Sequence, residues 1–82
     1  MSKVIQKVIT VETNSSMIAE MTYDRDEMRL WVTFTNKNIY SYDAVPETLF
    51  TQLISESTES IGKFFHQNIR KYPGLYPYKR CL

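Results

Sequence analysis

The sequence predicts an α+β fold in which an antiparallel meander of three or four strands carries two helices packed on one face. Two observations lead to this prediction. Segments in which apolar and polar residues alternate fill the first half of the chain, as in strands that bury one face. Segments with apolar residues three and four positions apart fill most of the second half, as in amphipathic helices. Strands followed by helices are typical of α+β domains.

Size and composition indicate one globular domain. A chain of 82 residues has room for a single core, so one domain is expected over residues 1–82. No apolar run approaches the roughly 20 residues that span a bilayer, and polar residues interrupt the start of the chain, MSKVIQKVIT, unlike a signal peptide. The single cysteine, Cys81, has no partner for an internal disulfide. We therefore expect a cytoplasmic protein without membrane contact.

The N-terminal segment allows two interpretations. Residues 4–12, VIQKVITVE, are rich in β-branched residues, which favours a strand. The positions of the apolar residues also suit a short helix, so both remain open. A turn cluster of small polar residues follows at 13–16.

The next two segments are expected to pair as a hairpin. Residues 16–23 and 28–35 alternate apolar and polar side chains around a polar turn at 24–27. Closing the hairpin directly at this turn places every apolar partner on one face of the sheet, which supports the pairing. This register pairs Tyr23 with Met28, Met21 with Leu30, Ala19 with Val32 and Met17 with Phe34.

The third strand, residues 39–43, contains the motif Tyr-Ser-Tyr. A two-residue loop before this strand would turn Tyr40 and Tyr42 away from the core and direct Ser41 toward it, which is costly for a polar side chain. A three-residue loop places both tyrosines on the core side instead. We therefore expect Tyr40 and Tyr42 to be structural aromatic residues whose hydroxyl groups reach the edge of the core.

Two helices are predicted after the strands, near residues 46–56 and 60–72. Pro46 suits the first turn of a helix, and Asp43 lies just upstream as a candidate cap. Residues 57–60 contain cap residues for the second helix, which Pro73-Gly74 ends. The helical faces comprise Leu49, Phe50, Leu53 and Ile54 in the first helix, and Ile61, Phe64, Phe65, Ile69 and Tyr72 in the second.

Short motifs in residues 15–72 together resemble a known family. A serine-led strand ending in Tyr-Asp corresponds to Ser16 through Tyr23-Asp24, an L-x-V-x-F strand to Leu30, Val32 and Phe34, and a Y-x-Y centre to Tyr40 and Tyr42. A V-P step corresponds to Val45-Pro46, an S-x-G with an aromatic pair to Ser60, Gly62, Phe64 and Phe65, and an I-R step to Ile69-Arg70. This pattern resembles the KTSC domain, named for the C-terminus of some lysyl-tRNA synthetases. The resemblance implies a domain for which RNA binding has been suggested.

The chain departs from this family pattern at two positions. The family often has a glycine in the hairpin where this chain has Lys37. A three-residue loop needs one residue with a left-handed backbone conformation. Asn38 tolerates that conformation better than Lys37 does, so we expect Asn38 to adopt it. His66 stands where an asparagine is common, so no role of that side chain carries over.

The charges are unevenly distributed. The formal net charge is +1, but residues 1–61 contain all nine acidic residues and five basic ones. Residues 62–82 contain five basic residues and no acidic residue. This asymmetry favours an anionic partner for the C-terminal third. Alternatively, the basic segment folds back onto the acidic part of the chain.

Single-stranded nucleic acid, above all RNA, is the sharper binding hypothesis, because its recognition needs aromatic faces and basic groups. Trp31 and Arg29 lie on the face opposite Leu30, and tyrosines alternate with the C-terminal basic residues. Alternatively, the N-terminal strand or the C-terminal tail covers Trp31. The predicted nucleic-acid-binding residues are Arg29, Trp31, Lys63, Arg70, Lys71, Lys79 and Arg80.

Catalysis is not expected. His66 has no second histidine, Cys81 lies in the tail, and neither glycine belongs to a phosphate-binding run. We therefore predict no catalytic residues, no metal and no cofactor. The alternative to nucleic-acid binding is a protein-interaction module, because an open sheet edge invites pairing. Such a module is a homodimer, or a phage-type adaptor or inhibitor that binds a host protein or sequesters a nucleotide.

Overall fold

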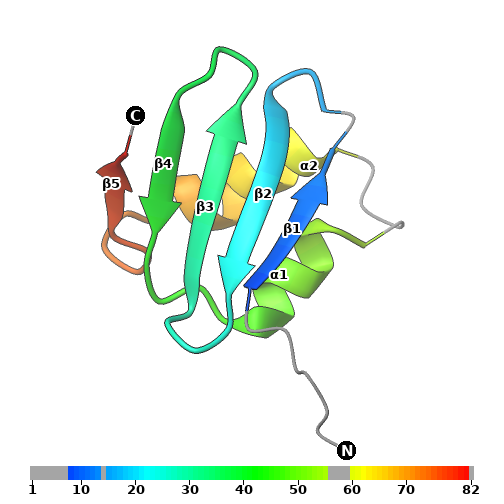
Figure 1. Ribbon diagram of the computed structural model, residues 1–82. Helices are drawn as coiled ribbons and strands as arrows, with labels where there is room; N and C mark the ends of the chain where they lie inside the picture. The colour runs from blue at the N-terminus through cyan, green and yellow to red at the C-terminus, as the bar shows by residue number, and fades with distance from the viewer. Residues whose placement is uncertain (1–7, 14, 56–59, 82) are drawn as a thin grey trace, which may run out of the picture.

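The computed structural model describes residues 8–13, 15–55 and 60–81. Five strands form one antiparallel sheet in the order β1-β2-β3-β4-β5 (Figure 1). The strands are β1 (Val8–Glu12), β2 (Ile18–Asp24), β3 (Arg29–Phe34), β4 (Ile39–Tyr42) and β5 (Tyr78–Arg80). The helices are α1 (Glu47–Leu53) and α2 (Ile61–Phe65), and a π-helical segment, η1 (His66–Arg70), continues α2.

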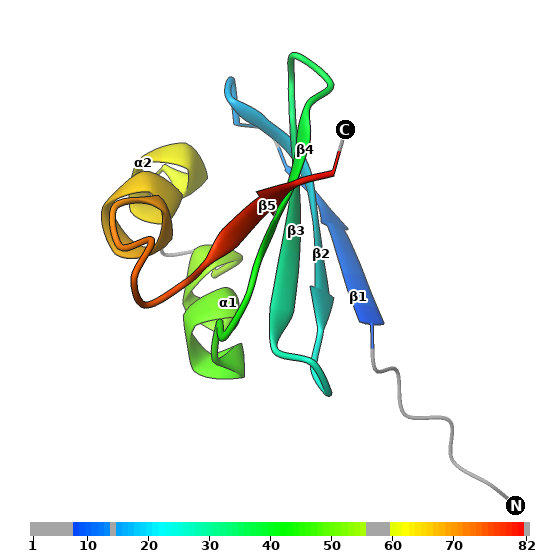
Figure 2. The ribbon, with the colours of Figure 1, turned by 90° about the vertical axis from the view of Figure 1, so that its left-hand side faces the viewer.

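The molecule has two layers. Figure 2 shows α1, α2 and η1 together on one face of the sheet, while none of the described helices covers the other face. The predicted α+β meander with two helices on one face is confirmed. The sheet has five strands rather than three or four, because the C-terminal segment adds β5 beside β4. We call the uncovered side of the sheet the outer face.

The core lies between the two layers. Tyr23 stacks on Phe50 with ring centroids 4.7 Å apart, and its hydroxyl donates a hydrogen bond to the Val45 carbonyl at 2.6 Å. This bond ties β2 to the connection that leads into α1. The fully or nearly buried apolar side chains are Ile18, Met21, Tyr23, Leu30, Val32, Phe34, Tyr42, Val45, Phe50, Leu53, Phe65 and Ile69.

The N-terminal strand is confirmed over residues 8–12, where β1 pairs with β2. Residues 4–7 of the predicted segment lie outside the described residues. Because β1 lies beside β2 in the plane of the sheet, its described part extends the sheet and does not cover it.

The β2–β3 hairpin has a four-residue loop, as predicted, but the loop lies one residue later in the chain, at 25–28. Tyr23 lies opposite Leu30, not Met28, and Asp24 lies opposite Arg29. The Asp24 carboxylate accepts hydrogen bonds from two backbone N–H groups of the loop, at 2.9 and 3.2 Å. This side-chain bonding stabilises a four-residue loop, so the predicted register is shifted by two residues and the predicted faces are preserved.

A β-bulge changes the first part of β2. The register shifts between Ile18 and Glu20, and the extra residue reverses the alternation of side chains. As a result Ile18 is buried opposite Phe34, whereas Ala19 is exposed. The predicted pairing of Ala19 with Val32 is therefore wrong, since alternation alone does not reveal a bulge.

The β3–β4 hairpin has a loop of three residues, as predicted, but the loop comprises residues 35–37, and the Phe34 N–H donates to the Asn38 carbonyl at 2.9 Å. Tyr40 lies opposite Val32, as the core-side register requires. The left-handed residue is Lys37, with φ of 73°, so the choice of Asn38 was wrong. A type I turn followed by one left-handed residue needs that conformation at the third loop position, which Lys37 occupies.

The two helices are shorter than predicted. Pro46 precedes α1 as its N-cap, without a side-chain hydrogen bond. Asp43 does not cap α1, because its carboxylate accepts a hydrogen bond from Arg29 instead. Ser60 caps α2 as expected, since its hydroxyl accepts a hydrogen bond from the Lys63 N–H at 3.3 Å. The widened turn of η1, with the Lys71 N–H donating to the His66 carbonyl at 3.0 Å, replaces the last part of the predicted second helix.

Candidate nucleic-acid interface

Trp31 lies on the outer face, in the middle strand of the sheet. Its side chain is half-buried, and no described segment lies over it. It borders a hollow of about 550 Å³, which we call the outer hollow. The outer hollow is lined by Arg29, Trp31, Ser41, Asp43, Lys79, Arg80 and Cys81.

Arg29 joins Trp31 to a carboxylate. Its guanidinium carbon lies 5.9 Å from the centre of the Trp31 ring, and its Nε donates to Asp43 Oδ1 at 2.7 Å. The hydrogen bond that Arg29 donates to Asp43, together with the charge of that carboxylate, raises the pKa of Arg29. Because Asp43 neutralises this charge, Arg29 offers a flat cationic surface beside Trp31 but little net attraction for a phosphate.

Strand β5 brings two further cations to the outer hollow. Lys79 lies opposite Ser41, which places it on the same face as Trp31. Arg80 lies at the rim and donates a hydrogen bond to Asn38 Oδ1 at 3.3 Å. Neither cation forms an ion pair with a described residue, so both charges remain available.

The other half of the outer face is acidic. Glu12 and Glu20 lie opposite each other on β1 and β2, and Asp24 lies opposite Arg29. Since these carboxylates repel an anion, a nucleic acid on this face is restricted to the side formed by β3, β4 and β5.

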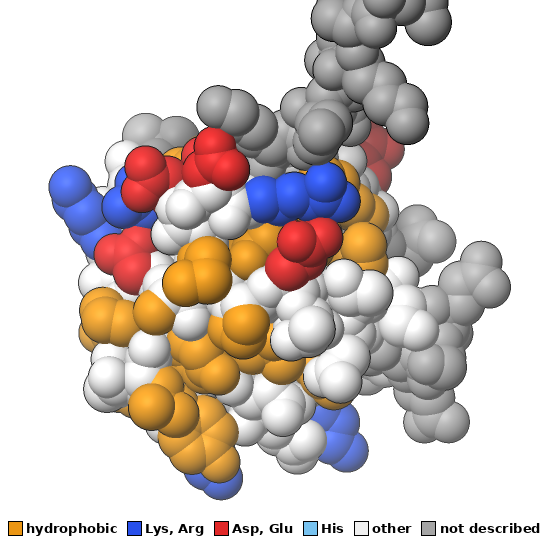
Figure 3. Space-filling view, turned by 90° about the horizontal axis from the view of Figure 1, so that it is seen from below, with side chains coloured by type: hydrophobic (Ala, Val, Ile, Leu, Met, Phe, Trp, Pro, Cys, Tyr) orange, Lys and Arg blue, Asp and Glu red, His pale blue; other side chains and the backbone are white. Residues whose placement is uncertain are grey.

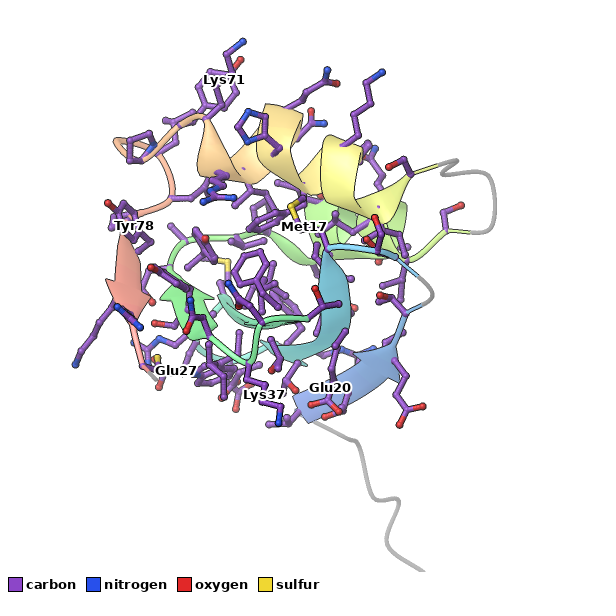
Figure 4. The ribbon with its side chains drawn as sticks, turned by 90° about the horizontal axis from the view of Figure 1, so that it is seen from above. Met17, Glu20, Glu27, Lys37, Lys71 and Tyr78 are labelled. Atoms are coloured by element: carbon purple, nitrogen blue, oxygen red, sulfur yellow. The ribbon has the colours of Figure 1, made fainter. Side chains whose placement is uncertain are left out.

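A second hollow lies on the other side of β4, between the sheet and η1. Its centre is Arg70, whose guanidinium carbon lies 5.7 Å from the centre of the Phe34 ring. Two adjoining lobes, of about 260 and 200 Å³, share Arg70, Phe34 and Tyr40; we call this space the Arg70 cleft. Figure 4 shows Met17 and Tyr78, which line different lobes, toward opposite ends of the space between η1 and the sheet.

Tyr40 and Tyr42 both face the helices, which confirms the predicted side. Tyr42 is 3% exposed and packs edge-on against Phe65, with ring centroids 5.1 Å apart. Its burial raises its pKa to about 12, which the nearby Arg70 partly opposes. Tyr40 is half-buried and lines both lobes of the Arg70 cleft, so it is also accessible to a ligand.

The structure therefore separates the predicted binding residues into three groups. Arg29, Trp31, Lys79 and Arg80 meet at the outer hollow, and Arg70 lies in its own cleft. Lys63 and Lys71 are exposed and line neither hollow. Figure 4 shows Lys71 pointing away from the sheet.

The alternative in which the basic segment neutralises the acidic one finds no ion pair among the described residues. Ion pairs join Arg25 to Glu47 and Arg29 to Asp43, and all four residues belong to the first 61. None of the five basic residues in 62–82 forms an ion pair with a described carboxylate.

Sequence reasoning did not find several residues of these hollows. The sequence pattern indicates a burial cost for Ser41 and a helix cap for Asp43, yet both residues line the outer hollow. Phe34 was assigned to the core, yet its ring also supports Arg70. The alternation of β4 contained a signal for Ser41, because a residue between two core-facing tyrosines must face outward.

Similarity to known proteins extends over most of the chain. The KTSC domain family model matches residues 14–72. The chain belongs to the KTSC domain family. It is also similar to a crystal structure of a KTSC domain protein from Yersinia pestis, with 27% sequence identity, a TM-score of 0.78, and coverage of 92% of this chain and 99% of the other. No curated protein matches the chain.

Most KTSC motif residues of this chain support the fold. Gly62 is buried where the β1–β2 connection meets α2, and a side chain there would meet Met17 Cε at 3.0 Å and Ser15 Oγ at 3.3 Å.

The KTSC match ends before β5. Lys79 and Arg80 of the outer hollow therefore lie beyond it, whereas Arg70 and Tyr40 lie within it.

Two classes of site find no support in the part of the chain that the structure describes. No described helix is long and apolar enough to cross a membrane. No group of three or more acidic, histidine or cysteine side chains among the described residues is arranged to hold a metal ion.

Proposed function

We propose that this KTSC domain is a non-enzymatic module that binds single-stranded RNA along the β4–β5 side of its sheet. The observation that carries the proposal is the set of basic residues in 62–82 that have no carboxylate partner among the described residues. Unpaired cations at a surface attract phosphates without first breaking an ion pair. An RNA ligand and the unpaired Cys81 agree with the cytoplasmic location that the sequence predicts.

The aromatic side chains around these cations support a single-stranded ligand. Trp31 lies on an uncovered sheet face beside the outer hollow, and bases of single-stranded RNA stack on such aromatic platforms. Lys79 lies on the same face, where it can contact the phosphates between stacked bases. A double helix does not present its bases for stacking, so single strands fit this surface better.

The proposal is tested by titrating fluorescent single-stranded RNA at low and at moderate salt. Trp31→Ala should weaken binding about tenfold or more, because stacking contributes roughly 1–3 kcal/mol per base. Lys79→Gln should weaken binding to all sequences alike and reduce the slope of affinity against salt by about one phosphate contact. The matched control is Lys63→Gln, which removes the same charge outside both hollows.

The outcomes separate the proposal from nonspecific attraction. Equal effects of Lys79→Gln and Lys63→Gln would show that only the total charge matters, and would contradict an interface on β5. Absence of binding at low salt and micromolar protein would remove the RNA proposal. Thermal unfolding of each variant must accompany the titration, because Trp31 also contacts its cross-strand neighbours.

A protein-interaction surface is the second candidate, favoured by one observation. Figure 3 shows hydrophobic side chains gathered at the lower end of the molecule, bordered by acidic and basic ones. Met28, in the β2–β3 loop, is 45% exposed. Its carbonyl accepts a hydrogen bond from the Val45 N–H at 2.8 Å, beside the exposed Ala44 and Pro46. Exposed apolar patches often mark protein contacts.

Light scattering tests this second candidate. If the patch holds two copies together, the mass should be that of a dimer at moderate salt, and Met28→Lys should return it to that of a monomer. A monomer at all concentrations would exclude the homodimer. Raised salt should leave an apolar interface intact while it weakens RNA binding, so the two candidates respond differently to the same change.

A further inference from the structure

We propose that the Arg70 cleft is a binding site for a nucleoside phosphate, distinct from the outer hollow. Arg70 holds the phosphate, and the tyrosine rings beside it hold the base. The ligand is a free mononucleotide or the phosphorylated end of an RNA strand, which share this chemistry. The inference does not depend on RNA binding at Trp31.

The guanidinium of Arg70 is positioned but unpaired. It lies over the face of Phe34, which is 8% exposed and therefore rigidly held in the core. No described carboxylate forms an ion pair with Arg70, and no hydrogen bond joins its guanidinium to a described residue. This contact with Phe34 holds the guanidinium beside the ring and leaves its N–H donors free for phosphate oxygens.

Three tyrosines surround the larger lobe of the cleft, which has a volume of about 260 Å³. The ring centroid of Tyr78 lies 6.1 Å from those of Tyr40 and Tyr42, and Tyr78 is 59% exposed. None of the three hydroxyls bonds to a described residue. Since no buried side-chain N or O atom among the described residues lacks a partner, the Tyr42 hydroxyl must reach the surface of the cleft. The tyrosines thus offer ring faces for a base and hydroxyls for its polar edge.

The other lobe is polar and carries no negative charge. Asn36 and Asn38 line it beside Met17 and Arg70, and no acidic residue lines either lobe. An amide can bond to both donors and acceptors, as a ribose requires. The adjoining volumes of about 260 and 200 Å³ reach the lower end of the range of about 300–1,000 Å³ for small-molecule sites.

The backbone around Arg70 is also unusual. Arg70 is the last residue of η1, whose π-helical hydrogen bonding widens the turn. Single π-helical turns inside helices occur frequently at functional sites. Here the wide turn follows Phe65 and carries Arg70 to the mouth of the cleft while Ile69 remains buried.

The test is calorimetric titration with AMP, adenosine and inorganic phosphate. AMP should bind at least about tenfold more tightly than either fragment, because only AMP uses both the arginine and the rings. Arg70→Gln should weaken AMP binding about tenfold or more, and Arg70→Lys should restore part of the loss. The matched control is Lys71→Gln, which removes one charge from the next residue and should leave AMP binding unchanged.

A second variant protects the test against misfolding. Tyr78→Ala removes an exposed ring, so it should preserve the fold and weaken AMP but not inorganic phosphate. If the ligand is an RNA end, a short RNA with a 5′-phosphate should bind more tightly than the same RNA without it, and Arg70→Gln should abolish the difference.

The outcomes distinguish this inference from RNA binding at the outer hollow. Binding of AMP that depends on Arg70, with no effect of Trp31→Ala, supports it even if longer RNA does not bind. RNA binding that depends on Trp31, with no binding of AMP or preference for a 5′-phosphate, would overturn it. Equal losses in Arg70→Gln and Lys71→Gln would also overturn it, since they would indicate general electrostatic attraction.

Discussion

Tyr42 shows how one side chain connects the core to a surface site. Its ring packs against Phe65 in the core, while its hydroxyl reaches the Arg70 cleft. Its neighbour Tyr40 is half-buried and lines both lobes of that cleft. The Tyr-Ser-Tyr motif therefore contributes to the core through the Tyr42 ring, and to the surface of the Arg70 cleft through the Tyr42 hydroxyl and Tyr40.

Removal of the Tyr42 ring should destabilise the protein. We expect Tyr42→Ala to lower the free energy of unfolding by about 3 kcal/mol or more, as for large aromatic truncations in cores. Tyr42→Phe should retain most of the stability, because the hydroxyl bonds to no described residue. Urea denaturation of the three proteins measures this. A Tyr42→Ala protein as stable as the parent would contradict the structural role of the ring.

The same residue predicts an alkaline loss of stability. The pKa of Tyr42 is raised to about 12 by burial, above the value of about 10 for an exposed tyrosine. The folded protein therefore holds the Tyr42 proton more tightly than the unfolded chain does. The contribution of this proton to the free energy of unfolding is complete below pH about 10 and is lost as the pH rises toward 12. Stability measured from pH 8 to 12 should fall less steeply in Tyr42→Phe than in the parent. Parallel curves would contradict the assignment, since the raised pKa of Tyr23 contributes equally to both.

At the scale of elements, hydrogen bonds of loops decide where strands meet. Asp24 stabilises the loop between β2 and β3, and the β3–β4 loop places Lys37 in the left-handed conformation. Lys37 is exposed, so no tertiary contact compensates for this conformation. The loop keeps the left-handed conformation at Lys37 because the register that places Tyr40 and Tyr42 on the core side requires it.

Lys37→Gly should therefore stabilise the protein. Glycine adopts positive φ without the penalty of about 1 kcal/mol or more for other residues, although it loses more chain entropy on folding. We expect a net gain of roughly 0.5 kcal/mol in the free energy of unfolding, measured by thermal and urea denaturation. Lys37→Ala serves as the control, because it removes the same side chain without relieving the backbone. A gain in the alanine variant as well would show that the lysine charge, not its conformation, is responsible.

At the scale of the whole molecule, the fold separates acidic from basic side chains on the outer face. The acidic carboxylates of β1 and β2 lie on one side of the outer face, and β5 carries Lys79 and Arg80 to the opposite edge. The helices leave that edge open on both sides of β4, where the outer hollow and the Arg70 cleft form. The uneven distribution of charge along the sequence thus becomes an acidic side and a basic side of the sheet.

The strand order predicts how hydrogen exchange is distributed. The central strands β2 and β3 are paired on both sides and carry buried residues on their inner face, so their amides should exchange most slowly. The three residues of β5 are all exposed and lie at the edge, so their amides should exchange rapidly. Exchange measured residue by residue by NMR checks this. Fast exchange throughout residues 29–34 would contradict the sheet, and protection of β5 on adding RNA would support its proposed role.

The sequence by itself determined the class of fold, the hairpin strands and the side on which Tyr40 and Tyr42 lie. These features depend on alternation, on loop length and on the cost of burying a polar residue, all of which act between near neighbours. The cap at Ser60 was predictable for the same reason, because its hydrogen bond spans three residues.

Only the tertiary structure decided the bulge in β2, the register of the β2–β3 hairpin, the addition of β5 and which residues line the two hollows. A bulge depends on backbone geometry that a hydrophobic pattern does not record. β5 is three residues long and exists because β4 offers an edge, so its own sequence carries little signal. The Arg70 cleft brings Phe34 together with Arg70 and Tyr78, which lie more than 30 residues later in the chain and meet Phe34 only when η1 packs across the sheet.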